Sequence, residues 1–284
     1  MTLKTSVGRI GRRTLMRYRV LTGQFRVLPE FIIIGAQRAG TTSLYSYISQ
    51  HPGVVPAFRK EVHFFDVHFA RGSVWYRAHF ETYLYRRYLR RMLRHPVVTG
   101  EASPYYLFHP HVPRRVYELL PRVKLIVLLR NPVDRACSHY FQQVSKGREA
   151  LSLIDALRTE DERVRADLER LRTDETFYSF NHRHYSYLAR GVYIDQFEQW
   201  MKFFARDQML ILKSEDLDRD PAAVMRGVFT FLELPPWSLS EYPRHHLSSY
   251  PPPDAATRAY LLDYFRPHNE RLYDFLGVNF GWDQ

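Results

Sequence analysis

Short apolar runs alternate with amphipathic stretches along the chain, and this pattern predicts parallel strands connected by helices. The runs that favour strands cover residues 31–35, 53–55, 97–100, 124–129 and 209–213. The stretches that favour helices cover residues 42–50, 74–93, 110–120, 132–146, 151–172, 191–204, 221–232 and 255–276. The expected fold is therefore a single α/β domain with a central parallel sheet flanked by helices.

The first strand leads into a P-loop-like strand–loop–helix segment. Its apolar run, residues 31–34, is followed by Gly35, a short loop and the start of a helix. Backbone N–H groups of such a loop and of the helix start point toward one position, where a phosphate can bind. The residues expected to form this anion site are Gln37, Arg38, Ala39, Gly40, Thr41, Thr42 and Ser43.

The spacing within this loop indicates which phosphate chemistry it serves. A nucleoside-triphosphate loop reads G-x-x-x-x-G-K-[ST]. The interval from Gly35 to Gly40 is the same here, but Thr41 replaces the lysine and the positive charge lies at Arg38. The loop therefore favours a phosphate ligand that needs no metal, and an ordinary strand–turn–helix is the alternative.

A second candidate phosphate site follows the apolar run at residues 123–129. Arg130 comes directly after this run, and Asn131-Pro132 is typical of a helix start. Open α/β sheets bind ligands at the carboxyl ends of their strands. Arg130 and Ser138, on the following helix, could therefore bind a second phosphate; the alternative is a capping arginine and a surface serine.

Several motifs together resemble sulfotransferases that use 3′-phosphoadenylyl sulfate (PAPS). The two main motifs read F-I-I-I-G-A-Q-R-A-G-T-T-S at 31–43 and L-I-V-L-L-R-N-P-V-D-R-A-C-S-H-Y at 125–140. Supporting stretches read K-E-V-H-F-F-D at 60–66, G-V-Y-I-D-Q-F at 191–197 and F-G-W at 280–282. The closest resemblance is to heparan sulfate sulfotransferases and their bacterial relatives.

This resemblance implies how the donor nucleotide binds. The first motif would hold the 5′-phosphosulfate, with Arg38 facing the transferred sulfuryl group. Arg130 and Ser138 would hold the 3′-phosphate, and Tyr193 would lie near the nucleotide. The product would be 3′-phosphoadenosine 5′-phosphate.

The resemblance also implies a general base, Glu61, supported by His63 and Asp66. Sulfuryl transfer depends on in-line positioning and on stabilisation of charge, much as phosphoryl transfer does. A carboxylate beside a lysine and a histidine has a lowered pKa. We expect the aromatic pair Phe64-Phe65 to form the dry walls that such a base needs.

Composition limits the environment of the protein. The chain has 284 residues, of which 45% are hydrophobic, enough for one large core. The single cysteine, Cys137, excludes an internal disulfide. No apolar run approaches the roughly 20 residues that span a bilayer. We expect a cytoplasmic protein, bacterial in origin, with no metal.

A net charge of +11 indicates an acidic ligand. Residues 1–29 contain no Asp or Glu and several arginines, so we expect a basic arm ahead of a domain at 30–284. This arm could contact an anionic membrane, be a solvated leader or be a transit peptide. Residues 83–94 combine apolar pairs with arginines. This pattern favours a helix whose apolar stripe packs on the core while its arginines face solvent. The alternative is a docking strip for an acidic acceptor or a membrane.

The acceptor is the least constrained part of the prediction. We expect a hydroxyl or amine on a carbohydrate, glycolipid or small metabolite, including acidic saccharides, and no specific nucleic acid. Residues 173–190 are rich in aromatic and hydroxyl side chains and could line its pocket. Unlike heparan sulfate enzymes, the chain has Glu101-Ala-Ser-Pro without a lysine, and its C-terminal loop offers only Arg244 for the 3′-phosphate. The alternatives are a metal-dependent phosphotransferase and a non-catalytic binder of polyanions or nucleotides.

Overall fold

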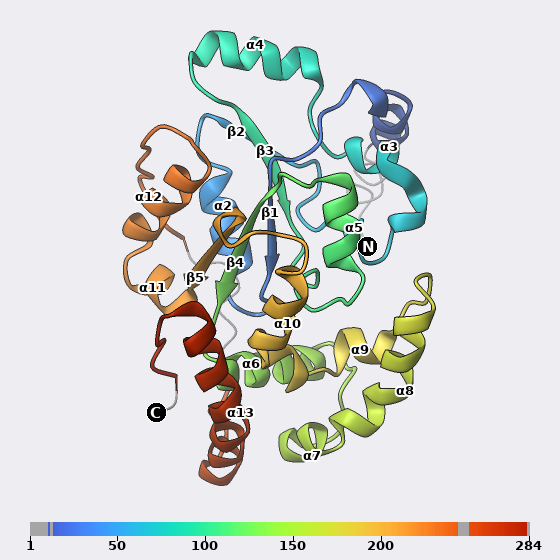
Figure 1. The fold of residues 1–284 in the computed structure, drawn as a ribbon, viewed down its shortest axis with the longest axis vertical. Coiled ribbons are helices and arrows are strands. Elements are labelled where there is room, and N and C mark those ends of the chain that lie inside the picture. Colours follow the sequence, from blue (N-terminus) through green and yellow to red (C-terminus); the bar gives the residue numbers. More distant parts are fainter. Residues whose placement is uncertain (1–10, 12–13, 244–249, 283–284) are drawn as a thin grey trace.

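A computed structural model describes residues 11, 14–243 and 250–282. Within these ranges the chain forms a five-stranded parallel sheet in the order β2-β3-β1-β4-β5 (Figure 1). The strands are β1 (Phe31–Gly35), β2 (Val54–Pro56), β3 (Val98–Ala102), β4 (Lys124–Leu129) and β5 (Met209–Lys213). The predicted α/β fold with a central parallel sheet is confirmed.

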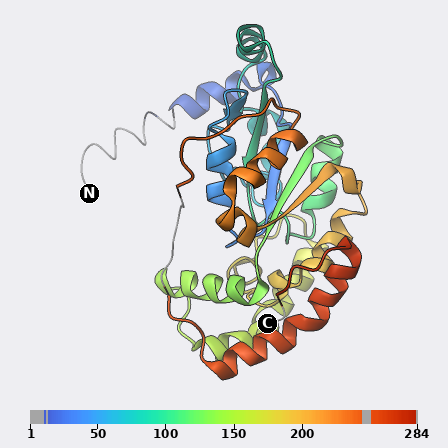
Figure 2. The ribbon, with the colours of Figure 1, turned by 90° about the vertical axis from the view of Figure 1, so that its left-hand side faces the viewer.

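Helices cover both faces of the sheet, and a further helical layer lies below its carboxyl edge (Figures 1 and 2). This layer contains α6, α7, α8, α9 and α13. The helices are α2 (Thr41–Ile48), α3 (Gly72–Arg77), α4 (Tyr83–Leu93), α5 (Val112–Leu119), α6 (Pro132–Ser145), α7 (Leu153–Arg158), α8 (Glu160–Thr173), α9 (Phe180–His184), α10 (Tyr193–Trp200), α11 (Ser214–Arg219), α12 (Pro221–Phe231) and α13 (Ala255–Leu276).

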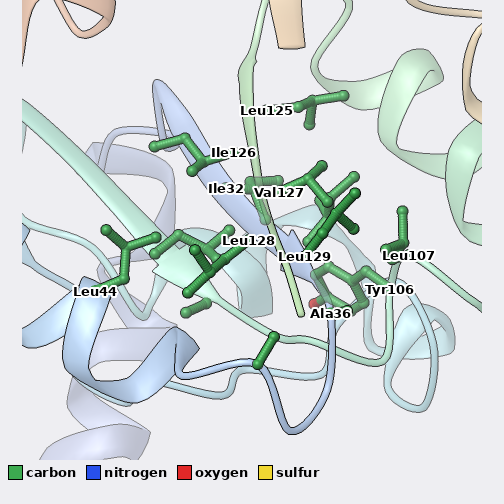
Figure 3. Packing of buried hydrophobic residues seen from close by; sticks show 14 of the residues in the cluster. Ile32, Ala36, Leu44, Tyr106, Leu107, Leu125, Ile126, Val127, Leu128 and Leu129 are labelled. Carbon is green, nitrogen blue, oxygen red and sulfur yellow. The ribbon is translucent and has the colours of Figure 1, made fainter. Parts of the chain in front are cut away.

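The two central strands form the middle of the hydrophobic core. Every residue of β1 is buried, and so is every residue of β4 after Lys124. Ile32 and Val127 belong to one buried cluster with Leu44 of α2 and Leu107, and Figure 3 shows Leu44 and Leu107 on opposite sides of these strands. Strands covered on both faces are continuously apolar, which explains why these runs could be recognised in the sequence.

One predicted helix, 74–93, is wrong, because the structure breaks it into α3 and α4. The Arg19 guanidinium donates to the carbonyls of Ala78 and Phe80, both at 2.6 Å. The Thr82 hydroxyl then accepts from the N–H of Tyr85 and caps α4. Donors from a distant segment thus satisfy the carbonyls that a continuous helix would use. The predicted helix at 151–172 is likewise two helices, α7 and α8.

Helix α4 lies at the amino edge of the sheet (Figure 1). There Arg86 forms ion pairs with Glu30 and Glu81. The expectation of an apolar stripe on the core is wrong for this helix. Leu84 is 79% exposed and Met92 is 63% exposed, whereas Arg86 is 8% exposed. The buried arginine forms its ion pairs in the space that an apolar face would otherwise occupy.

The described part of the basic segment before β1 contacts this same region. Residues 14–21 are helical, and Arg19 binds the carbonyls between α3 and α4. Val27 is buried in the core, and its N–H donates to the Glu81 carbonyl at 3.0 Å. Residues 1–10 and 12–13 lie outside the described residues.

Candidate active site

A cavity of about 700 Å³ opens at the carboxyl edge of the sheet. It begins where β1 and β4 end, as the parallel arrangement of the strands predicts. Its size is typical of a small-molecule site. The lining residues are Gln37, Arg38, Ala39, Gly40, Thr41, Thr42, Ser43, Glu61, Pro104, Arg130, Ser138, Gln142, Gln143, Lys146, Arg148, Tyr178, Arg183, His184, Ser214, Asp218 and Tyr250.

The loop between β1 and α2 forms one wall of this cavity. Gly40 caps α2 with φ of 92°, a left-handed conformation that side chains with a Cβ rarely adopt. The first N–H groups of any helix lack acceptors within that helix. Together with the hydroxyls of Thr41 and Thr42, they make this wall rich in hydrogen-bond donors. All seven residues predicted from the loop line the cavity.

The two predicted phosphate motifs meet at Arg38. The Arg38 Nε donates to the Ser138 hydroxyl at 3.0 Å. The Arg38 carbonyl in turn accepts from Nη1 of Arg130 at 3.3 Å. Residues about 100 positions apart in the chain therefore form one basic cluster, and Arg38 is held there in a left-handed backbone conformation.

Tyr193 and Arg244 are placed differently from the other predicted nucleotide residues. Tyr193 is buried behind the cavity, where its hydroxyl donates to the Arg130 carbonyl at 2.8 Å. It therefore supports Arg130 and does not line the cavity itself. Arg244 lies outside the described residues. From the same C-terminal loop, Tyr250 lines the cavity with its hydroxyl 3.4 Å from Nη2 of Arg130.

Glu61 lines the same cavity as the phosphate loop and is held by two cationic groups. Lys60 Nζ donates to Glu61 Oε1 at 2.8 Å and to the Thr42 hydroxyl at 3.0 Å. His63 Nε2 lies 3.3 Å from Glu61 Oε2, while His63 Nδ1 lies 2.7 Å from Asp66 Oδ2. Sequence reasoning missed Lys60 as a site residue, although its position next to Glu61 was a usable signal.

These contacts fix the charges of the pair. Burial raises the pKa of Glu61, but the His63 hydrogen bond and Lys60 together lower it to about 2. Burial lowers the pKa of His63, but hydrogen bonds to Asp66 and Glu61 raise it to about 9. Near neutral pH, the structure therefore holds a carboxylate at Glu61 next to an imidazolium at His63.

The expected aromatic walls around Glu61 are wrong. Phe64 and Phe65 are almost fully buried, and Phe64 stacks on Tyr76 with ring centroids 4.5 Å apart. Their backbone turns both rings into the core, away from the cavity. The Glu61 side chain remains 43% exposed and can therefore contact a ligand.

The opposite wall comes from α6 and from the segment at 173–190, which was predicted to line an acceptor pocket. That segment contributes Tyr178, Arg183 and His184, and the end of α6 contributes Lys146, followed by Arg148. Arg183 Nη2 lies 3.2 Å from Nε2 of His63. Sequence reasoning did not single out these cations, because only the fold brings them to the same cavity as Glu61.

The described residues contain no group of three or more His, Cys, Asp and Glu side chains able to hold a metal ion. Cys137 is buried in α6, and burial raises the pKa of its thiol to about 11. A thiol with such a pKa is a poor nucleophile at neutral pH. Among the described helices, none has the length and apolar character required to cross a bilayer.

A donor-rich loop at a strand end, a second basic group and a carboxylate line this cavity, and such a lining suits an anionic ligand of an α/β protein. A family model described as "Sulfotransferase domain" matches residues 28–248. The chain therefore belongs to the sulfotransferase family and is an enzyme that transfers a sulfuryl group. The family match disfavours the phosphotransferase and the non-catalytic binder.

Individual relatives agree with this family. A sulfotransferase from Alicyclobacillus acidocaldarius has a similar solved structure, with 30% identity, a TM-score of 0.65, and coverage of 91% of this chain and 100% of that one. The membrane-associated sulfotransferase kil1 of Dictyostelium discoideum is 26% identical over 92% of this chain and 68% of its own length. Heparan sulfate glucosamine 3-O-sulfotransferase 5 of Mus musculus is 28% identical over 90% of this chain and 74% of its own length.

Proposed function

We propose that this sulfotransferase takes the sulfuryl group from PAPS and transfers it to a hydroxyl, with Glu61 as the proton acceptor. The observation that carries the proposal is that the cluster of Arg38, Ser138 and Arg130 and the carboxylate Glu61 line the same cavity. This arrangement can place a donor anion and an acceptor hydroxyl in line across the same space.

The lining chemistry fits a polyanionic nucleotide. The cationic side chains Arg38, Arg130, Lys146, Arg148 and Arg183 outnumber the carboxylates Glu61 and Asp218. The loop at 37–43 would hold the 5′-phosphosulfate, and Arg130 with Ser138 would hold the 3′-phosphate. Bound PAPS supplies an activated sulfuryl group with a good leaving group; the protein supplies orientation and charge.

The low pKa of Glu61 shapes its part in the reaction. A carboxylate with a pKa of about 2 is a weak base toward a free alcohol. It can nevertheless accept a hydrogen bond from the acceptor hydroxyl and orient that hydroxyl for attack. The proton becomes acidic as the new sulfur–oxygen bond forms, and Glu61 then accepts it.

The basic wall favours an acidic, hydroxylated acceptor. Lys146 and Arg148 are exposed at the cavity rim, and Arg183 lies between this rim and His63. A saccharide or glycolipid that carries carboxylates or sulfates would meet complementary charge there. The name of the mouse relative, a heparan sulfate glucosamine sulfotransferase, supports a carbohydrate acceptor.

Transfer from ³⁵S-labelled PAPS to a panel of acidic saccharides, neutral saccharides, glycolipids and small alcohols tests this function. We expect labelled product from a hydroxylated acceptor, and the same yield with EDTA, because Arg38 and backbone N–H groups provide the positive charge. A requirement for added Mg²⁺, or labelling from a nucleoside triphosphate in place of PAPS, would contradict the proposal.

A further proposal concerns the amino edge of the molecule. We divide the chain into a basic arm at 1–29 and a catalytic domain at 30–284, and we propose a cytoplasmic protein that touches an anionic membrane. The arm and α4 together present exposed Leu15, Tyr18, Leu84 and Met92 beside many arginines. Exposed apolar and arginine side chains on one helix are typical of interfacial helices.

A further inference from the structure

A buried carboxylate lies directly behind the loop that carries Glu61. Glu101 is in β3, paired with Ile32 of β1, and its side chain is inaccessible to solvent. Its hydrogen-bond donors are one amide and three hydroxyls, all of them neutral. A carboxylate buried among neutral groups carries a large desolvation penalty, and burial raises the pKa of Glu101 to about 7. A core apolar residue would avoid this penalty, so the carboxylate calls for an explanation.

One oxygen of this carboxylate holds the start of the base-bearing loop. Glu101 Oε2 accepts from the backbone N–H of Val62 at 3.2 Å. The same oxygen accepts from the Ser103 hydroxyl at 2.6 Å, and that hydroxyl accepts from the N–H of His63 at 3.2 Å. His63 has φ of 54°, a left-handed conformation that a residue with a Cβ adopts only when its surroundings enforce it.

The other oxygen holds the rest of the loop. Glu101 Oε1 accepts from the Tyr106 hydroxyl at 3.1 Å. That hydroxyl accepts from the N–H of Phe64 at 2.8 Å and from the N–H of Phe65 at 3.4 Å. Four consecutive backbone amides, from Val62 to Phe65, therefore bind one carboxylate directly or through a single hydroxyl.

We propose that Glu101 is a positioning residue, which sets the geometry of Glu61 and His63 by holding the four amides between Val62 and Phe65. Every partner of the carboxylate donates to it, so the hydroxyls of Ser103 and Tyr106 are oriented with a lone pair toward the loop. An amide at position 101, or protonation of Glu101 below its pKa of about 7, would reverse part of this pattern. The expected effect of this positioning on turnover rests on the proposed role of Glu61. The expected effect on the pKa of His63 does not.

Two tyrosines provide a matched test. Tyr76 and Tyr106 are both fully buried, and both hydroxyls donate to Glu101 Oε1, at 2.9 and 3.1 Å. Only the Tyr106 hydroxyl also accepts from loop amides. Tyr106→Phe and Tyr76→Phe therefore each remove one hydroxyl from the same carboxylate, but only the first releases the loop.

We expect Tyr106→Phe to lower kcat by about 10- to 100-fold, the range for a reacting group displaced by up to about 1 Å. Tyr76→Phe should leave kcat within about twofold, while both variants lose similar thermal stability. Affinity for 3′-phosphoadenosine 5′-phosphate should not change in either, because the phosphate loop is untouched. Equal kcat values for the two variants would overturn the proposal.

A second readout separates this inference from the role of Glu61. The pKa of His63, followed by NMR, should fall in Tyr106→Phe and stay near its native value of about 9 in Tyr76→Phe, because the contacts to Asp66 and Glu61 depend on the loop. Should Tyr106→Phe fail to fold, Ser103→Ala releases the His63 amide alone and should lower the same pKa. An unchanged His63 pKa in the folded variant overturns the proposal. Glu61→Gln with normal kcat would instead overturn the proposed function.

Discussion

The two edges of the sheet are both basic, but only the carboxyl edge surrounds the cavity that forms the candidate active site. At the carboxyl edge, Arg38, Arg130 and Lys60 each bind a defined partner and surround one cavity. At the amino edge, Arg87 and Arg91 are exposed on α4, which carries no acidic residue. The strand β1 separates the edges by about 16 Å, at roughly 3.3 Å per residue. Positive charge alone therefore does not mark a candidate site, and neither does an ion pair such as that of Arg86 with Glu30; cations that line one cavity together with an accessible carboxylate do.

The largest effect that tests this contrast concerns Glu61. Glu61→Gln keeps the size of the side chain but removes its ability to accept a proton. We expect kcat to fall by about 10²- to 10⁴-fold, the usual contribution of a general base. Binding of 3′-phosphoadenosine 5′-phosphate, measured by calorimetry, should stay nearly constant. Near-normal turnover of the Glu61→Gln variant, measured where the chemical step limits the rate, would show that another group accepts the proton.

The second effect concerns the grip on the nucleotide. Arg130 lies at the end of β4 and contacts the Arg38 carbonyl. A hydrogen bond to a charged group contributes roughly 1.5–3 kcal/mol, so Arg130→Gln should weaken binding of 3′-phosphoadenosine 5′-phosphate at least about tenfold. Affinity for AMP, which lacks the 3′-phosphate, should change little. An equal loss of affinity for both nucleotides would contradict the assignment of Arg130 to the 3′-phosphate.

The features that could be predicted from the sequence are those that depend on neighbouring residues. The strand at 124–129 and the loop at 37–43 are continuous patterns, and the structure places both as expected. The Arg38–Ser138 contact joins residues 100 positions apart and was not predicted: the family resemblance assigned Arg38 to the sulfuryl group and Ser138 to the 3′-phosphate, without a contact between them.

The errors arose where distant side chains override a local pattern. Helix 74–93 breaks because Arg19 and Thr82 supply hydrogen bonds to the backbone. Phe64 and Phe65 turn inward because their amides bind Tyr106. Lys146 and Arg183 reach the cavity only through the packing of α6 and α9 below the sheet (Figure 2). None of these tertiary contacts leaves a periodic signal in the sequence.

A third, smaller effect concerns the acceptor side of the cavity. Lys146 and Arg148 are exposed and line the cavity. Replacing both with Gln should raise KM for an acidic acceptor by about fivefold at low salt, as expected where the two charges together contribute about 1 kcal/mol. The increase should shrink at high salt, as screening grows. An unchanged KM at low salt would exclude this rim from acceptor binding.

The smallest kinetic effect is expected at α4, and it completes the comparison. Arg87, Arg90 and Arg91 were candidates for guiding an acidic acceptor, but α4 lies at the amino edge of the sheet (Figure 1), whereas the cavity opens at the carboxyl edge. Replacing all three with Gln should therefore leave kcat and acceptor KM within about twofold.

The same variant should lose membrane binding if α4 docks on an anionic surface. Co-sedimentation with phosphatidylserine-containing vesicles should weaken by about fivefold for each arginine removed, since each contributes about 1 kcal/mol near such a surface. Replacement of Arg165, Arg170 and Arg172 on α8 changes the net charge equally and serves as the control. Equal vesicle binding by the two triple variants would show that α4 is a solvated helix that does not dock on the membrane. A rise in acceptor KM in the α4 variant alone would show instead that the acceptor reaches the amino edge, and the functional contrast between the edges would fail.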